Sequence, residues 1–282
     1  MQRDKALELS WWAAPFLTVL GFAGMYFMLF VAAFIRSATG TVTFGEGLGA
    51  ASEDLVTIGF AQLLGYGAVI LGGVRMFGGE RPVTEALGLV PVPWRALAAA
   101  VVFGVAFQFV LSELGNIASI AFPLSEAQRL RMEQLLSAHS LSDGIAMAFA
   151  LVVVAPVTEE LLFRGVLFRG LAVRYGAPAA ALASALLFGV SHMVPAVVIS
   201  ATAAGVVFAV VVWRFGSVAI TMAIHMTVNA VPMLLPKRVL PIPGFNTFEA
   251  GVEHLPLPVF LIAAIVSVGA AYVLGRVAKE PA

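Results

Sequence analysis

Residues 156–165 read PVTEELLFRG, so two adjacent glutamates and an arginine interrupt one of the most apolar parts of the chain. An ionised carboxylate in a hydrocarbon environment costs roughly several kcal/mol unless it is paired or hydrated. Glu159 and Glu160 are therefore unsuited to a position that faces lipid. Residues of this kind nearly always face the interior of a helix bundle or a water-filled cavity. The stretch predicts a helical membrane protein with a polar site inside it.

The composition of the whole chain indicates the same class. Of its 282 residues, 61% are hydrophobic and 11% are charged, whereas a soluble domain has about 25% charged residues. The formal net charge is zero, so the charge balance gives no indication of a nucleic-acid partner. The chain has no cysteine, which excludes disulfides, a Cys nucleophile and Cys metal ligands.

The apolar runs predict an all-α fold, a polytopic transmembrane bundle of about eight spans, because each span needs about 20 mostly apolar residues. A polar, Gly-rich loop is expected over 37–54, further loops over 77–93 and 236–258, and a short interfacial helix over 125–140. We expect a single domain over 1–282 with a motif-bearing core at about 141–235. The expected spans are 11–35, 55–76, 94–122, 144–175, 179–192, 196–213, 217–235 and 259–277.

Three local features refine this reading. The glycines of the second span predict close packing on a neighbouring helix, and Pro156 is expected to bend the fourth. The first apolar run lacks a small-residue cleavage site at its end, so we interpret it as a retained span.

Lys and Arg residues in the loops number ten on the side of the N-terminus and five on the other. This bias predicts that both termini are cytoplasmic.

Glu160 and Arg164 are four residues apart and therefore share one face of their helix. The first interpretation is a structural pair in which Arg164 keeps Glu160 ionised. Glu159 points about 100° away from Glu160 and has no partner in its own helix. It is the candidate for chemistry.

His192 is the predicted partner of Glu159. A turn at Gly176 lies 17 residues after Glu159 and 16 residues before His192. Two antiparallel helices joined there carry both residues to a depth of roughly 25 Å from the turn. A carboxylate beside an imidazole can hold a water molecule and take its proton, which is general-base chemistry.

His225 and Asn229 form a second pair, four residues apart on one helical face. Donors aimed at a substrate carbonyl would stabilise a developing oxyanion. His225 lies nine residues from the turn at Phe215-Gly216, about 14 Å by helix rise. Its convergence with the deeper Glu159 therefore requires a tilted or bent helix.

Other polar residues have plainer interpretations. Glu113 and Asn116 share a face of the third span, where they either line the same cavity or pair with an arginine. His139 and His254 lie in or near polar segments and are interpreted as solvated.

The motifs Glu159-Glu160-x-x-x-Arg164, Phe188-x-x-x-His192 and His225-x-x-x-Asn229 resemble those of the CPBP family of intramembrane proteases. This family includes the type II CAAX prenyl endopeptidases and bacteriocin-processing and immunity-type proteins. The three motifs occur in the order found in the family and span residues 159–229, about a quarter of the chain. The expected eight spans also agree with the family.

The resemblance implies a role for each matching residue. Glu159 would activate water with His192 as its partner, and His225 with Asn229 would form the oxyanion hole. Supporting roles would fall to Glu160, Arg164 and Phe188, the last by packing on the helix that bears His192. We favour a site without metal or other cofactor. A zinc ion held by Glu159, His192 and His225 is the alternative, because three protein ligands are normal for catalytic zinc.

The predicted function is hydrolysis of a peptide bond in a membrane-associated protein or peptide, with the lipid bilayer as the other partner. Prenylated proteins and proteins with a C-terminal sorting signal are both substrates to consider. The expected location is a bacterial inner (plasma) membrane. The alternative is a non-proteolytic membrane adaptor or a bacteriocin-immunity protein that retains the fold.

Overall fold

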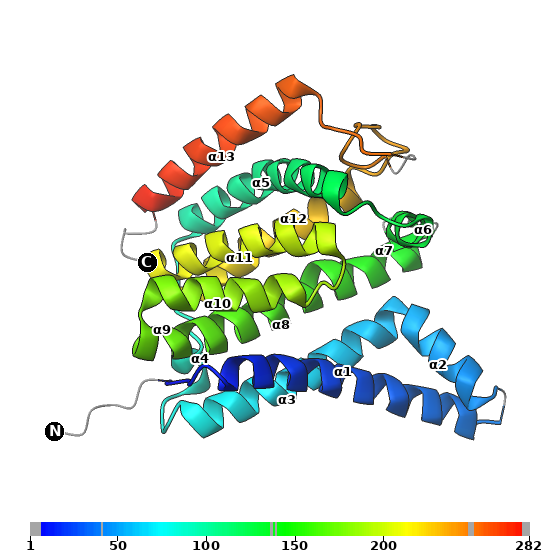
Figure 1. Cartoon of the computed structure of the whole chain (residues 1–282). Helices are drawn as coiled ribbons and strands as arrows, with labels where there is room; N and C mark the ends of the chain where they lie inside the picture. Colours follow the sequence, from blue (N-terminus) through cyan, green and yellow to red (C-terminus); the bar gives the residue numbers. More distant parts are fainter. Residues whose placement is uncertain (1–6, 41, 136–137, 139, 248–250, 278–282) are drawn as a thin grey trace.

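The computed structural model describes residues 7–40, 42–135, 138, 140–247 and 251–277. Within these residues the chain is helical and has no strand. Helices run back and forth across the bundle, and the first turn of α1 and the last turn of α13 lie at the same end (Figure 1). The helices are α1 Ala13–Ala38, α2 Phe44–Glu53, α3 Leu55–Phe77, α4 Val83–Ala86, α5 Trp94–Ala121, α6 Glu126–Leu135, α7 Leu141–Met147, α8 Ala155–Glu160, α9 Arg169–Tyr175, α10 Ala177–Val190, α11 Pro195–Phe215, α12 Val218–Leu234 and α13 Leu257–Val277, with π-helical segments at Ala148–Val154 and Leu161–Phe168.

All eight expected spans are helices, which confirms a polytopic helical bundle. Six of them are long and apolar enough to cross a membrane. The other two, α10 and α12, are apolar but have 14 and 17 residues, fewer than the ~20 that a bilayer core requires. The chain is therefore an integral membrane protein with two short helices inside its bundle.

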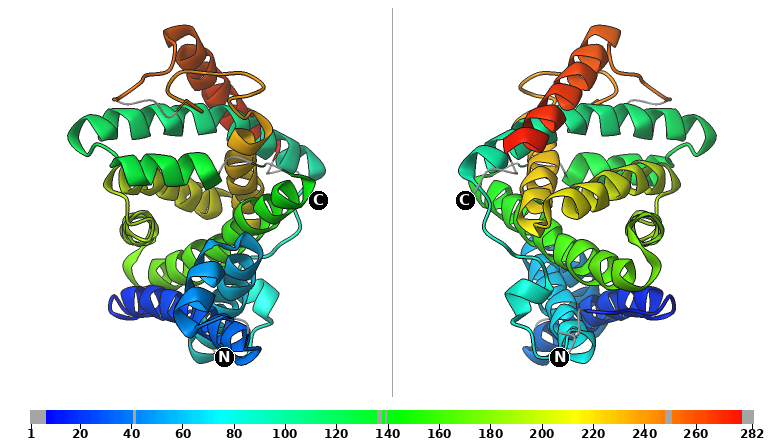
Figure 2. Two further views of the ribbon diagram at one scale, coloured as in Figure 1. Left: turned by 90° about the vertical axis from the view of Figure 1, so that its right-hand side faces the viewer. Right: turned by 90° about the vertical axis from the view of Figure 1, so that its left-hand side faces the viewer.

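The bundle has two large apolar cores on either side of the helix that runs from Leu141 to Tyr175, and a smaller cluster of Val231, Phe245 and Leu255. One core joins α1, α3, residues 161–171 and α10, and the other joins α5, α11, α12 and α13. The two turned views show the α1–α3 pair at one edge of the molecule and α13 at the opposite edge (Figure 2). The glutamate-bearing helix thus lies in the middle of the fold.

Close packing of the Gly-rich second span is confirmed. Gly65 of α3 lies directly against the backbone of Gly24 and Met25 in α1, where a Cβ atom would clash. The absence of side chains at both glycines lets these two helices approach backbone to backbone.

The expected loop over 37–54 was wrong, because it contains α2. Thr43 and Glu46 form a capping box: the Glu46 backbone N–H donates to the Thr43 hydroxyl, and the Thr43 backbone N–H donates to Glu46 Oε2 at 2.8 Å. This T-x-x-E pattern is a known start signal that offsets the cost of the glycines that follow. The loop over 77–93 also contains a single helical turn, α4.

The expected interfacial helix is present in part, as α6 over Glu126–Leu135. His139 lies outside the described residues. Pro156 does not interrupt the fourth span. The helix changes there from π-helical to α-helical geometry, with Pro156 in the first turn of α8. Proline lacks an N–H, so a position at the start of a new hydrogen-bonding pattern suits it.

Candidate active site

The Glu160–Arg164 pair expected from the sequence is confirmed. Both side chains have 0% exposure, and Arg164 Nη1 lies 3.1 Å from Glu160 Oε1. The guanidinium carbon lies 4.3 Å from the ring centre of Phe188 and 5.1 Å from that of Phe208. The cation is therefore held between two aromatic faces and one carboxylate, in the dry interior of the bundle.

His225 of α12 extends this pair. Its Nδ1 lies 3.1 Å from Glu160 Oε1, and its Nε2 lies 3.8 Å from Glu159 Oε2. A carboxylate only accepts hydrogen bonds, so Nδ1 donates to Glu160 and Nε2 faces Glu159. The imidazole thus bridges the two glutamates, and its orientation is fixed by Glu160.

That Glu159 and His192 hold a water molecule between them stays a prediction. No hydrogen bond or ion pair joins these two side chains in the described part of the chain. The Glu159 carboxylate instead lies beside His225 and accepts a hydrogen bond from Gln62 Nε2 at 3.3 Å. Equal depth along two helices does not ensure that two residues share a face, and here His225 lies next to Glu159.

Gln62 is the site residue that the sequence reading missed. It lies in α3, is 8% exposed, and also donates to the Thr158 hydroxyl at 3.1 Å. A side-chain amide within an apolar, Gly-rich span was itself a signal, because polar groups at that depth usually face a partner.

His192 lies just after the last residue of α10, in the short turn to α11. Its Nδ1 is 2.9 Å from the Phe188 backbone oxygen, and its ring packs edge-on against Phe188 with centres 4.9 Å apart. A carbonyl oxygen only accepts, so in a neutral imidazole Nδ1 carries the proton and Nε2 carries a lone pair. Phe188 contacts His192, four residues later in the chain, and also packs on Arg164 and His225.

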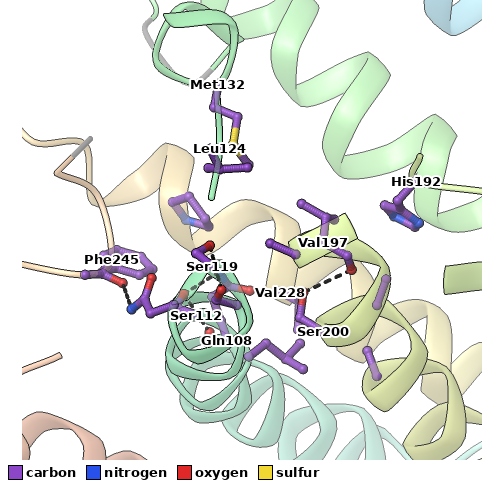
Figure 3. A pocket seen from close by; sticks show the side chains of 18 of the residues that line it. Gln108, Ser112, Ser119, Leu124, Met132, His192, Val197, Ser200, Val228 and Phe245 are labelled. Carbon is purple, nitrogen blue, oxygen red and sulfur yellow. Dashed lines mark hydrogen bonds between the residues drawn. The ribbon is translucent and has the colours of Figure 1, made fainter. Parts of the chain in front are cut away.

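A cavity of about 470 Å³ brings together the remaining site residues. His192, His225, Asn229 and Phe188 line it, with walls from α5, α11 and α12 and from the connection between α12 and α13 (Figure 3). Glu159 and Glu160 are not among its lining residues; they lie behind His225. The cavity lining includes the C-terminal half of α5 and the first part of α11, which lie toward the end of the bundle opposite the two described chain ends (Figure 1).

Asn229 is fixed against the glutamate-bearing helix. Its Nδ2 donates to the Leu151 backbone oxygen at 2.8 Å. That acceptor lies in the π-helical segment Ala148–Val154. An amide nitrogen carries two hydrogens, so one donor remains for the cavity.

The two glutamates lie between two π-helical segments. Ala148–Val154 precedes them and Leu161–Phe168 follows them. π-Helical turns are rare and are found frequently at functional sites. They widen the backbone and change which residues share a face, and this allows Glu159 and Glu160 both to reach His225.

Glu113 and Asn116 were expected to line the cavity or to pair with an arginine. Asn116 lines it and donates to the Gly244 backbone oxygen at 2.7 Å. Glu113 binds His254 Nδ1 at 2.7 Å and the Leu255 backbone N–H at 2.9 Å. The two residues therefore attach the α12–α13 connection to α5. His254, which we interpreted as solvated, is half-exposed and paired with Glu113.

A resident zinc ion does not fit this arrangement. Among the described residues no three His, Asp or Glu side chains are grouped so that they could hold a metal ion. Both ring nitrogens of His225 face carboxylates, and His192 contacts neither glutamate. We therefore derive no step through a metal.

A comparison with protein-family models matches part of the chain. Residues 141–231 match the family model described as type II CAAX prenyl endopeptidase Rce1-like. The matched segment contains all three motifs and excludes α1 to α5, including Gln62. No curated protein and no solved structure matches the chain.

Proposed function

Because the segment that carries its three motifs is Rce1-like, we propose that this membrane protein is an intramembrane endopeptidase of the CAAX type. It hydrolyses a peptide bond of a membrane-associated protein or peptide. The observation that carries the proposal is the series of buried Arg164, Glu160 and His225 with the partly buried Glu159, beside a cavity that His192 and Asn229 also line.

In this proposal Glu159 is the general base. Its carboxylate takes a proton from a water molecule, and the oxygen of that water attacks the peptide carbonyl carbon. His192 holds the same water from the cavity side through Nε2, since its Nδ1 is engaged with the Phe188 carbonyl. Glu159 then returns the proton to the departing amine as the C–N bond breaks.

His225 and Asn229 act on the carbonyl oxygen. That oxygen becomes negative when water adds, and the free amide hydrogen of Asn229 and an N–H at His225 Nε2 stabilise it in a site of low dielectric. Because His225 Nδ1 already donates to Glu160, this role requires a proton on both ring nitrogens of His225. The Leu151 carbonyl holds the Asn229 amide in place, so this donor needs little reorganisation during the reaction.

Glu160 and Arg164 position the catalytic residues. Glu160 accepts from His225 Nδ1 and thereby directs Nε2 toward Glu159. Arg164 supplies the charge that allows Glu160 to stay ionised while fully buried. An acid–imidazole pair oriented by a third group is the usual arrangement for activation in hydrolases.

The location of the cavity bears on the substrate. With both termini in the cytoplasm of a bacterial cell, the cavity lies nearer the outer face of the plasma membrane. That position suits exported proteins retained by a C-terminal membrane-spanning sorting signal. With the opposite orientation the cavity would face the cytoplasm, where prenylated proteins are found.

The test is a comparison of membrane-protein termini by mass spectrometry in cells that express the wild type or Glu159→Ala. A protease produces new termini that disappear with the variant, at equal amounts of protein. The cleavage is then repeated in vesicles with the purified protein and the substrate so identified. Unchanged cleavage by Glu159→Ala would overturn the proposal.

Glu159→Gln separates the protease from the alternative function. This substitution keeps the shape of the side chain and removes the base. An adaptor or a bacteriocin-immunity protein would keep its cellular activity with glutamine at this position, whereas an endopeptidase would lose it. Zinc measured in the purified protein would address the metal alternative independently of activity.

A further inference from the structure

One face of α5 carries a row of polar side chains along the cavity. Gln108, Ser112, Asn116 and Ser119 are spaced by four, four and three residues, and all of them line the cavity. Figure 3 shows Gln108, Ser112 and Ser119 on the wall opposite Val197 and Ser200 of α11. We call these four residues the α5 ladder. It lies outside the segment that matches the family model.

Most hydrogen-bond donors of the α5 ladder are engaged within the protein. The Ser112 and Ser119 hydroxyls donate to the backbone oxygens one turn earlier, at 3.0 and 2.9 Å. Gln108 Nε2 donates to Ser112 Oγ at 3.2 Å, and Asn116 Nδ2 donates to the Gly244 oxygen at 2.7 Å. The groups that remain for a ligand are oxygen lone pairs and one N–H of Gln108. The α5 ladder is therefore mainly a row of acceptors.

The spacing of these acceptors matches an extended peptide. Residues four apart on a helix are separated by about 6 Å along its axis. The N–H groups on one edge of an extended chain repeat every two residues, or about 6.7 Å. The twelve residues from Gln108 to Ser119 cover roughly 16 Å, the length of about five extended residues.

The opposite wall leaves room for such a chain. Four of the six α11 side chains that line the cavity are small, namely Ala196, Ser200, Ala201 and Ala204, and the other two are Val197 and Phe208. His225 and Asn229 of α12 line the same space. A chain lying along α5 would therefore bring its carbonyl groups beside the proposed oxyanion donors.

We propose that the α5 ladder binds the backbone of the substrate as an extended segment of about five residues, through its N–H groups. The inference rests on the proposed endopeptidase function and names its substrate class: an unfolded peptide stretch at the membrane. A transmembrane helix does not qualify until it unwinds, because its N–H groups are already bonded within the helix. The site would then select substrates first by their extended backbone and only second by their side chains.

The probe for the test is a library of randomised decapeptides, each with a hexadecanoyl anchor and one central benzoylphenylalanine. The protein carries Glu159→Ala, so binding is measured without cleavage, in vesicles of phosphatidylethanolamine and phosphatidylglycerol. Irradiation should attach the peptides to α5, as located by mass spectrometry. Ser112→Ala and Gln108→Leu should each lower the yield about fivefold, the usual effect of one lost hydrogen bond.

Two controls complete the design. Ser267→Ala makes the same chemical change on α13, at a buried serine outside the cavity, and should leave the yield unchanged. Peptides N-methylated at alternate residues lack one row of N–H groups and should be captured at least fivefold less well by the intact α5 ladder.

The proposal is overturned if no photoproduct maps to α5, or if capture is insensitive to both substitutions and to N-methylation. The protein with Glu159 intact distinguishes this result from a failure of the enzyme assignment. Ladder-dependent capture without any cleavage would reject the endopeptidase and keep the binding site. Cleavage that does not depend on the α5 ladder would reject the proposed binding site and keep the endopeptidase.

Discussion

Gln62 is the residue outside the matched segment that touches the Glu159 carboxylate. We predict that Gln62→Leu reduces kcat/KM for cleavage in vesicles by about tenfold, the cost of about 1.4 kcal/mol. The loss arises because the carboxylate is no longer held beside His225. As a positioning residue, Gln62 should also change the pH–rate profile.

Thr158→Val is the matched comparison, since it removes the other acceptor of Gln62 and leaves the contact to Glu159. If this variant causes an equal loss and Gln62→Leu leaves the pH profile unchanged, Gln62 is only a packing residue.

The Arg164–Glu160 pair is fully buried, which gives it a high desolvation cost. In the described part of the chain, the guanidinium nitrogens and Glu160 Oε2 have no hydrogen-bond partner, although all are fully buried. Arg164→Met alone leaves a buried carboxylate without its cation, so we predict a loss of about 3–5 kcal/mol of stability.

The double variant Glu160→Leu with Arg164→Met should recover most of that stability, because it removes both charges together. It should remain inactive, since His225 loses the acceptor that orients it. Thermal unfolding in detergent and cleavage in vesicles measure the two properties separately. A double variant that is stable and active would remove Glu160 from the proposed site.

At the scale of elements, Asp54 joins α2 to α3. It ends α2 and caps the N-terminus of α3, and its carboxylate lies 2.9 Å from Arg36 of α1. Burial raises the pKa of Asp54, but hydrogen bonds from Thr57, the Val56 N–H and Arg36 outweigh it, so the pKa lies below its ordinary value of 3.8.

A lowered pKa fixes the sign of the pH dependence. The carboxylate stabilises the fold fully above its ordinary pKa, and this stability is lost as the pH falls through the lowered value. We predict that Asp54→Asn lowers the unfolding midpoint by a constant amount above about pH 5 and by progressively less below about pH 4. A difference between the two proteins that grows on acidification would contradict this assignment.

The order of the helices was predictable, because span length and apolar composition depend on sequence alone. The short helix α2 was also signalled, by the Thr43–Glu46 capping box. It was not predictable which residues of the fourth span share a face. A count of 100° per residue assumes α-helical geometry, and the two π-helical segments change that rotation on both sides of the glutamates.

At the scale of the whole molecule, the site was predictable as a set of residues but not as a set of contacts. Helix rise gave Glu159 and His192 equal depth, yet depth leaves the direction of each side chain undetermined. Glu160 was assigned to Arg164 alone, because the approach of α12 depends on packing between helices. Gln62 belongs to a span with no motif, so its contact with Glu159 required the tertiary structure.

The direction of the bundle in the membrane decides which substrates can reach the cavity, and the sequence makes this measurable. The chain has no cysteine, so single cysteines can be labelled without background. The excess of Lys and Arg on the side of the termini predicts that Arg174→Cys and Arg214→Cys face the cytoplasm. Glu53→Cys, at the last residue of α2, and Met193→Cys, in the turn between α10 and α11, should react with a membrane-impermeant maleimide in intact cells. If the cysteines at the arginine positions are labelled instead, the bundle has the opposite orientation in the membrane. His192 and the cavity would then lie toward the cytoplasm, which favours prenylated proteins over exported ones as substrates.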